Sequence, residues 1–149
     1  TKVRMILDPS ESGVKYATQK TNRVTLPRIF EAILKCLILL TLVQSPQEMV
    51  SGFVLAYKDA FWQIPLRQEE QRFFCATATI RGRKRWIAFL LTAQGSTHAP
   101  TSWARVAALV MRLTQGMFSA EEVMLMCYVD DPFAALRGPT IAENCWPQL

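Results

Sequence analysis

Residues 123–136 read VMLMCYVDDPFAAL, two apolar runs on either side of a short polar stretch. The runs are Val123–Tyr128 and Phe133–Leu136, and the stretch between them contains Asp130 and Asp131. Two such runs joined by a short connection predict a β-hairpin. Neighbouring carboxylates repel one another unless water or a cation screens them, so a divalent metal is one reason to keep both at an apolar tip. A solvated Asp-Asp turn is the alternative, and so short a motif alone does not decide.

A second hairpin and a long helix precede this stretch. Arg72–Ile80 and Trp86–Leu91 are rich in strand-forming residues, and the Gly-containing sequence RGRKR joins them, which predicts a hairpin. Pro100 opens a helix that runs to Gly116. The apolar residues of this helix form a stripe that we expect to be core: Trp103, Val106, Ala107, Val110, Met111 and Leu113.

The first half of the chain alternates short strands, turns and one helix. Ile29, Ile33, Leu37 and Leu40 recur at helical spacing after Pro27, and Ser45-Pro46 ends or interrupts this helix. The other expected elements are a strand at Val3–Leu7, a turn at Asp8–Gly13, a loop at Tyr16–Arg23, a new start at Pro46–Val50, a strand within Phe53–Trp62 and one helical turn within Pro65–Gln71. This order predicts a mixed α+β fold.

Composition narrows the class of protein. Half of the 149 residues are hydrophobic and 19% are charged, which excludes a disordered chain. The net charge of +5 favours polyanionic partners, but an ordinary basic surface explains it equally well. The longest apolar run, Ala32–Val43, is too short to span a bilayer, so we expect no membrane partner.

Four cysteines are scattered along the chain without a CxxC pair: Cys36, Cys75, Cys127 and Cys145. Neither a zinc site nor a disulfide scaffold fits that spacing. Reduced thiols in an intracellular protein fit it best.

The order of five segments resembles that of reverse transcriptases from long-terminal-repeat retrotransposons and retrovirus-like elements. The segments are Thr1–Asp8 (TKVRMILD, similar to a fingers strand), Thr21–Ile29 (TNRVTLPRI), Lys58–Leu66 (KDAFWQIPL, similar to motif A), Trp86–Trp103 (WIAFLLTAQGSTHAPTSW, similar to motif B) and Tyr128–Asp131 (YVDD, similar to motif C). The resemblance covers nearly the whole chain in the expected order and spacing.

The resemblance implies the fingers and palm of a right-hand polymerase, with an antiparallel palm sheet, helices packed on one face of it, and no thumb. Fingers would comprise residues 1–24 and 67–95, and palm residues 25–66 and 96–149. The implied partners are an RNA or DNA template-primer, deoxynucleoside triphosphates, and the thumb and ribonuclease H domains of a parent polyprotein. Such elements act inside the cell, in cytoplasmic particles and the nucleus.

The resemblance also assigns site residues. Asp130 and Asp131 would be catalytic and would bind Mg²⁺ or Mn²⁺, and Arg4 would clamp the incoming triphosphate. Phe61 would exclude a ribose 2′-hydroxyl, and the remaining nucleotide-binding residues would be Asp59, Ala60, Gln94 and Gly95. Four basic residues at a hairpin tip are candidates for template phosphate contacts, although a solvated turn explains them more simply: Arg81, Arg83, Lys84 and Arg85.

One departure from the family pattern concerns catalysis. The motif A carboxylate of the pattern D-x-x-D-A-F falls at Ala56, and Ala cannot bind a metal. Asp59 is a poor substitute, because strand residues three apart point to opposite faces. Pro132 after the Asp pair, and Thr92-Ala93 before Gln94, are further departures. We therefore expect a decayed copy that is impaired in polymerisation.

Two alternatives remain open at this stage. The chain could be a non-catalytic nucleic-acid-binding remnant of a polymerase, or an α+β interaction domain with a chance Asp-Asp turn. For a fingers and palm fragment we also expect poor solubility, because apolar surface that a thumb normally covers would be exposed.

Overall fold

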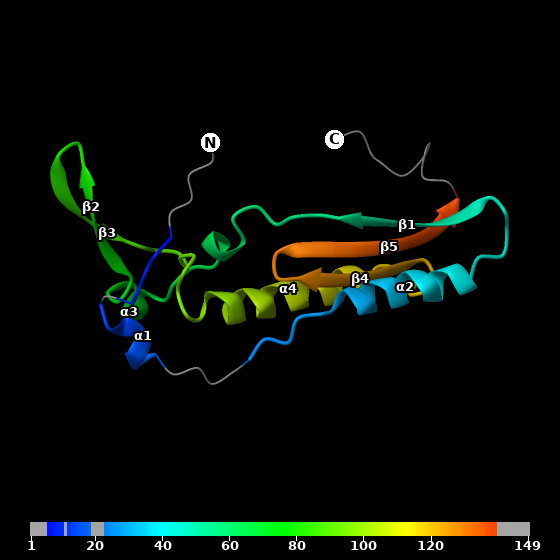
Figure 1. Cartoon of the computed structure of the whole chain (residues 1–149), viewed down its shortest axis with the longest axis horizontal. Coiled ribbons are helices and arrows are strands. Elements are labelled where there is room, and N and C mark those ends of the chain that lie inside the picture. The colour runs from blue at the N-terminus through cyan, green and yellow to red at the C-terminus, as the bar shows by residue number, and fades with distance from the viewer. Residues whose placement is uncertain (1–5, 11, 19–22, 140–149) are drawn as a thin grey trace. The chain divides into compact units, whose positions relative to one another are not determined.

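The computed structural model describes residues 6–10, 12–18 and 23–139, and it divides the chain into two compact units. The first comprises Thr1–Val24 and Lys58–Arg105, and the second Thr25–Tyr57 and Val106–Leu149. Each unit has a small antiparallel sheet of its own, and helices accompany both (Figure 1). The predicted mixture of helices and antiparallel strands is confirmed at this level.

The second unit is built on a three-stranded antiparallel sheet. Its strands are β1 (Glu48–Val54), β5 (Asp131–Pro139) and β4 (Val123–Tyr128), with β5 in the centre. The predicted hairpin around the Asp pair is confirmed, but its loop is shorter than expected. Tyr128 pairs with Asp131, so only two residues lie outside the strands and Pro132 belongs to β5.

Helix α2 (Ile29–Thr41) packs on β1 and β5, along one face of this sheet (Figure 1). Its covered positions are Ala32, Lys35, Cys36 and Leu39, and Leu39 is completely buried. They follow the three-and-four spacing of one helical face. The apolar residues that predicted the helix lie on its exposed side instead: Ile29, Ile33, Leu37 and Leu40. This exposed apolar face is the kind of surface that limits solubility.

Two predictions for the residues that follow α2 were wrong in their boundaries. The expected new start at Pro46–Val50 is a turn followed by β1, and β1 begins at Glu48 and ends at Val54 instead of lying within Phe53–Trp62. Pairing with β5 decides these boundaries, because strand formation depends more on the neighbouring strand than on local propensity.

Helix α4 (Ala99–Gln115) agrees with the predicted helix to within one residue at each end. Its first seven residues belong to the first unit and the rest to the second. The predicted core stripe is only half correct. Trp103 and Ala107 are buried, whereas Val106, Val110 and Leu113 are exposed.

Two long polar side chains, those of Gln115 and Arg137, form hydrogen bonds between elements of the second unit. Gln115, at the end of α4, accepts a hydrogen bond from Leu125 N–H (2.9 Å) and donates one to Val123 C=O (2.7 Å). It thereby satisfies backbone groups at the outer edge of β4, as a neighbouring strand would. At the far end of β5, Arg137 donates to Leu42 C=O (2.7 Å) and contacts Glu48 (3.2 Å).

The first unit contains the predicted second hairpin, β2 (Cys75–Ile80) and β3 (Arg83–Ala88). Its boundaries were wrong: β2 begins at Cys75 instead of Arg72, and β3 begins at Arg83 and ends at Ala88 instead of covering Trp86–Leu91, because strand pairing continues up to a two-residue turn. Short elements accompany it: α1 (Val14–Ala17), the 3₁₀ turn η1 (Ala60–Gln63) and α3 (Gln68–Gln71). Its buried apolar residues are Ala60, Phe89, Ala93, Ala99 and Trp103. Within the described ranges, no helix has the length and apolarity needed to cross a membrane.

Two N-terminal predictions have different outcomes. Tyr16 lies in α1, so the expected loop over Tyr16–Arg23 is wrong at its start, because Gly13 with φ of 74° ends the preceding turn and lets a helical turn begin. The expected strand Val3–Leu7 falls mainly outside the described residues. Within it, the Leu7 N–H donates to Gln94 C=O at 2.8 Å.

We predict that Gln115→Ala destabilises the chain by about 1–3 kcal/mol, because it leaves the Leu125 N–H and the Val123 C=O without their partner. The measurement is the free energy of unfolding in urea. Thr114→Ala is the matched control, since the Thr114 hydroxyl donates to Val110 C=O in its own helix and its loss is expected to change stability by less than about 0.5 kcal/mol. Equal losses in both variants would contradict the role given to Gln115.

Candidate active site

The turn between β4 and β5 holds a strained residue. Val129 has φ of 58°, in the left-handed region, which a β-branched residue rarely enters. A conformation of this kind costs on the order of 1–3 kcal/mol and persists only where its surroundings impose it. The pairing of Tyr128 with Asp131 imposes it here, because two residues must reverse the chain. Strain of this kind is common in functional turns.

Position 56 lies beside the Asp pair. The β1–β5 pairing continues past the end of β1: Leu55 N–H donates to Pro132 C=O and Tyr57 N–H to Asp130 C=O, each at 2.8 Å. Both bonds keep the register of the Val54–Phe133 pair. Ala56 is therefore opposite Asp131, as a non-hydrogen-bonded pair whose Cα atoms are about 4.5 Å apart in such ladders.

The two faces of the sheet differ in exposure at this end. Most residues on one face are buried or half-buried (Phe53, Tyr57, Cys127, Pro132 and Ala134), with the exposed Leu55 as an exception. On the other face, Gly52, Val54, Ala56, Tyr128 and Asp131 are exposed, although Phe133 is half-buried. Side chains of directly opposite residues project from the same face of a sheet. Position 56 and Asp131 thus share an open face, where a ligand could reach both.

Pro132 explains why β1 ends where it does. In this register, a residue other than proline at position 132 would donate a backbone hydrogen bond to Leu55 C=O. Proline has no N–H, so that bond is missing. One bond of the pair, from Leu55 N–H to Pro132 C=O, remains. A proline in a central strand is unusual, and here it removes a single bond beyond the end of β1 and leaves the hairpin intact.

The pKa of the Cys127 thiol depends on burial and on the charges of the turn. Burial, and then the charges of Asp130 and Asp131, raise the pKa of Cys127 above its usual value. Its Sγ lies 3.4 Å from Val129 C=O. Burial, followed by the charge of Cys127, also raises the pKa of Tyr57. The Cys127 thiol thus lies near both carboxylates, and the Tyr57 phenol lies near that thiol.

The acidic residues present do not complete a metal site. Across residues 6–10, 12–18 and 23–139, no group of three or more His, Cys, Asp or Glu side chains is placed to hold a metal ion. Asp130 is half-buried and Asp131 exposed, and the position that would add a third carboxylate is Ala56. The turn as it stands therefore offers two carboxylates and does not fit a two-metal centre, which uses shared oxygen ligands.

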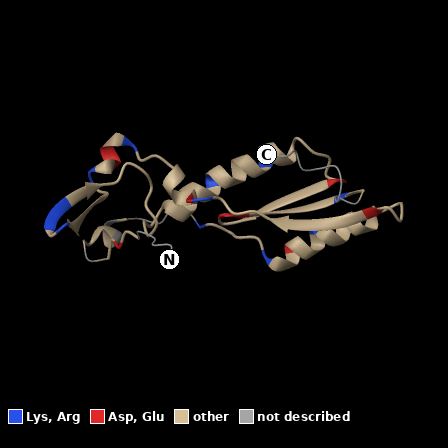
Figure 2. Ribbon diagram, turned by 90° about the horizontal axis from the view of Figure 1, so that it is seen from above, with Lys and Arg blue, Asp and Glu red and all other residues tan. Residues whose placement is uncertain are grey.

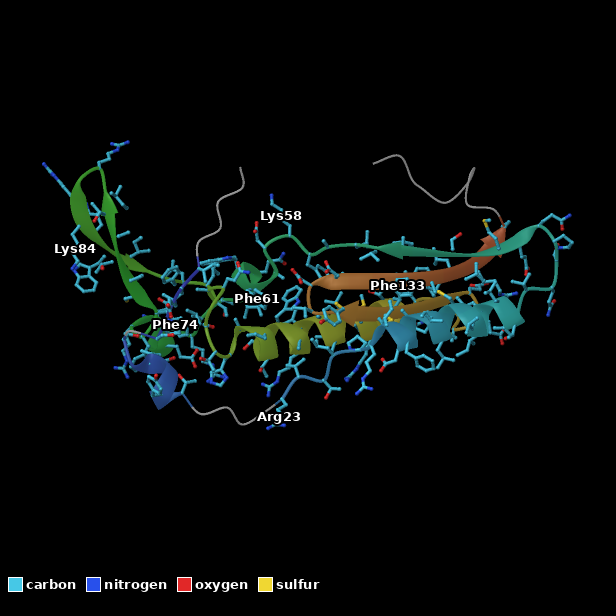
Figure 3. All side chains as sticks on the ribbon, viewed as in Figure 1. Arg23, Lys58, Phe61, Phe74, Lys84 and Phe133 are labelled. Atoms are coloured by element: carbon cyan, nitrogen blue, oxygen red, sulfur yellow. The ribbon has the colours of Figure 1, made fainter. Side chains whose placement is uncertain are left out.

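The predicted nucleotide-binding residues Asp59, Ala60 and Phe61 lie in the first unit. Asp59 is exposed, with φ of 52°, at the start of η1. Ala60 is buried, so only its backbone could contact a ligand. Phe61 is half-buried in η1 (Figure 3). A bond from Thr92 N–H to Ile64 C=O (2.7 Å) joins this region to the segment that leads to Gln94.

The backbone conformation and the close neighbours of Gly95 both require a glycine at this position. Its φ is 101°, and a Cβ there would collide with Leu7 C=O. The half-buried Gln94 accepts the Leu7 backbone bond, so residues 94–95 hold the N-terminal segment against the unit. Arg4 lies outside the described residues.

The predicted basic tip residues are all exposed, and Arg81-Gly82 forms the two-residue turn of the second hairpin with φ of 52° and 73°. Positive φ at both central positions is the pattern of a type I′ turn.

A groove in the first unit was not predicted from the sequence. Its volume is about 1170 Å³, and its lining combines apolar residues such as Phe74 and Ile64 with hydroxyl groups near the start of α4. The Ser96 hydroxyl is one of them, and it is buried without a hydrogen-bond partner in the described part of the chain. No pattern of charges or motifs in the sequence marks this groove, since residues from five separate stretches line it.

A scan against protein-family models found no match for this chain, and a search of curated proteins found no relative.

We predict that Asp130→Asn lowers the pKa of the Cys127 thiol, because a neighbouring negative charge disfavours the thiolate. Asp131→Asn is expected to lower that pKa by less, since Asp130 contributes the larger charge effect. The pH dependence of iodoacetamide alkylation at Cys127, followed by peptide mass spectrometry, measures it. Glu121→Gln is the control and should leave the profile unchanged. An unchanged profile in Asp130→Asn would contradict the arrangement.

We also predict that Val129→Asn stabilises the chain by about 1 kcal/mol, because Asn adopts the left-handed conformation with less strain than Val. Unfolding in urea measures the change. Val129→Ile keeps the β-branch and is expected to give no gain. If the two variants were equally stable, Val129 would not be strained in the folded protein.

Proposed function

We propose that this chain is the fingers and palm portion of a retroelement reverse transcriptase, in a copy whose catalytic centre lacks one carboxylate. The observation that carries the proposal is the register at the turn. Two segments that the resemblance treats as separate motifs meet at this turn: position 56, which is expected to hold the third carboxylate, lies opposite Asp131 at the start of β5. An Asp-Asp turn that arose by chance would not be expected to lie opposite that position.

The exposure of this face supports the same proposal. Polymerase chemistry needs carboxylates that both a metal ion and a nucleic acid can reach, and Asp131 and position 56 are both exposed. In a copy with an aspartate at position 56, that carboxylate and those of the turn would hold Mg²⁺, which would supply charge stabilisation for phosphoryl transfer. With Ala at position 56, the remaining pair is insufficient, so we propose that this copy is strongly impaired.

The first unit would contribute nucleotide and template contacts. Phe61 would lie beneath the sugar of the incoming nucleotide, and Gln94 and Gly95 would line its pocket. The hydrogen bond from Thr92 N–H to Ile64 C=O, which lies two residues before Gln94 and three after Phe61, supports this assignment. Asp59 is exposed at the start of η1, and Ala60 would act through its backbone.

The second candidate is a non-catalytic nucleic-acid-binding remnant. The specific observation that favours it is Ala56 itself, together with the exposed basic tip of the second hairpin. Such a remnant would keep the fold and the positive charge of the hairpin tip but would need no metal. The two candidates differ in one property, namely whether restoring the carboxylate restores chemistry.

We predict that Ala56→Asp raises primer extension by at least about 100-fold, since removing a main source of transition-state charge stabilisation costs about that much. The assay uses an RNA template, a DNA primer, deoxynucleotides and Mg²⁺, in a longer polypeptide that supplies a thumb. Ala56→Asn is the matched control, similar in size but without the charge, and should stay inactive.

Three outcomes separate the candidates. Extension by the Ala56→Asp variant alone supports the polymerase. If the unchanged sequence extends the primer as well as the Ala56→Asp variant does, Asp59 instead of position 56 would be the motif A carboxylate. Inactivity of both proteins, each shown to be folded, would contradict the polymerase and favour the binding remnant.

A further inference from the structure

The second hairpin carries a concentrated positive charge. Residues 75–88 include Arg81, Arg83, Lys84 and Arg85 and contain neither Asp nor Glu. Figure 2 shows the basic residues gathered at the end of this hairpin. Four cations around a two-residue turn repel one another, and the repulsion is relieved by a polyanion.

The register assigns the residues of the hairpin to two different faces. Trp86 is opposite Thr77 and Lys84 is opposite Thr79, so these four side chains share one face. All four are exposed. The other face carries Ala76, Ala78 and Ile87, which are half-buried, together with the exposed Arg83 and Arg85. Lys84 is drawn on β3 in Figure 3.

Trp86 breaks the expected pattern of this hairpin. A half-buried strand places apolar residues on the covered face and polar ones outside, and Ile87, Thr77 and Thr79 obey that rule. The indole of Trp86 lies instead on the open face, 80% exposed. An indole that is 80% exposed beside a lysine leaves an aromatic face on which a partner could stack.

We propose that the face formed by Thr77, Thr79, Lys84 and Trp86 binds single-stranded nucleic acid. A base would stack on the Trp86 indole, and the backbone phosphates on either side of it would contact Lys84 and the turn residue Arg81. An aromatic platform inside a positive surface is the combination that single strands use, because their bases present free π-faces. A duplex hides those faces, and an acidic peptide would need the charges but not the ring.

This inference rests on the proposed function only for the origin of the strand, a template or transcript of the parent element. It does not depend on Asp130, Asp131 or position 56. Its test therefore uses binding alone, and neither a failure of primer extension nor its success changes the expected result.

The test measures the affinity of the full chain for fluorescein-labelled dT20 by fluorescence anisotropy in 50 mM KCl. Trp86→Leu is expected to weaken binding about 5- to 150-fold, the usual loss for one stacked base. Trp86→Phe keeps a ring and should stay within about threefold of the unchanged chain. Lys84→Gln is expected to weaken binding more than Arg85→Gln, which removes the same charge from the other face.

Controls make each outcome decisive. Tyr16→Leu removes an aromatic ring that is 86% exposed outside the hairpin, and it should bind as the unchanged chain does. A 20-base-pair duplex should bind more weakly than dT20, whereas U20 should bind comparably. Undiminished binding by Trp86→Leu, equal losses in its Leu and Phe variants, tighter binding of the duplex, or no binding of dT20 at all would each overturn the proposal.

A second measurement needs no substitution. Cys75 is an exposed thiol on the same face of the hairpin, diagonal to Trp86. Bound dT20 is expected to slow maleimide labelling of Cys75 at least about threefold, whereas the half-buried Cys36 should react at an unchanged rate. Equal labelling of Cys75 with and without saturating dT20 would place the strand elsewhere.

Discussion

The pairing of residues 55–57 with residues 130–132 is the constraint on which the candidate site depends. Two backbone hydrogen bonds of 2.8 Å extend the β1–β5 ladder as far as the turn. Because side chains alternate along a strand, a shift of one residue would move position 56 to the covered face and separate it from Asp131. The ladder therefore determines whether two motifs that are distant in the sequence can form one site. Pro132 limits it to a single bond at Leu55, and Arg137 anchors the opposite end of β5.

Much of the local structure could be predicted from the sequence. Both hairpins and α4 follow from alternating apolar runs, a Gly-containing turn and helical spacing after a proline, which are signals carried by neighbouring residues. The boundaries of β1 could not be predicted in the same way, since its pairing with β5 defines them. The side of α2 that is buried was also hidden, because its apolar residues surround the helix and spacing alone cannot choose between Leu39 and Leu37.

The site was predicted in part. The Asp pair at a hairpin tip follows from the sequence, and so does the importance of position 56, although only through a resemblance. The strain at Val129, the charges around Cys127 and the roles of Gln115 and Arg137 depend on contacts between distant residues, which no local pattern records. Trp86 is different, because alternation along β3 already marks it as an aromatic residue on a polar face. The basic tip and this ring together form the surface proposed to bind nucleic acid, and that surface is independent of the turn between β4 and β5.

The most direct test of this account is a disulfide between positions 56 and 131. In the double variant Ala56→Cys/Asp131→Cys, a non-hydrogen-bonded pair about 4.5 Å apart at Cα lies within the range that disulfides span. We predict that mild oxidation links the two residues, as seen by mass spectrometry of tryptic peptides, and that Leu55→Cys/Asp131→Cys remains unlinked. Linkage through position 55, or none through position 56, would show that the third carboxylate position does not meet the Asp pair and would contradict the account.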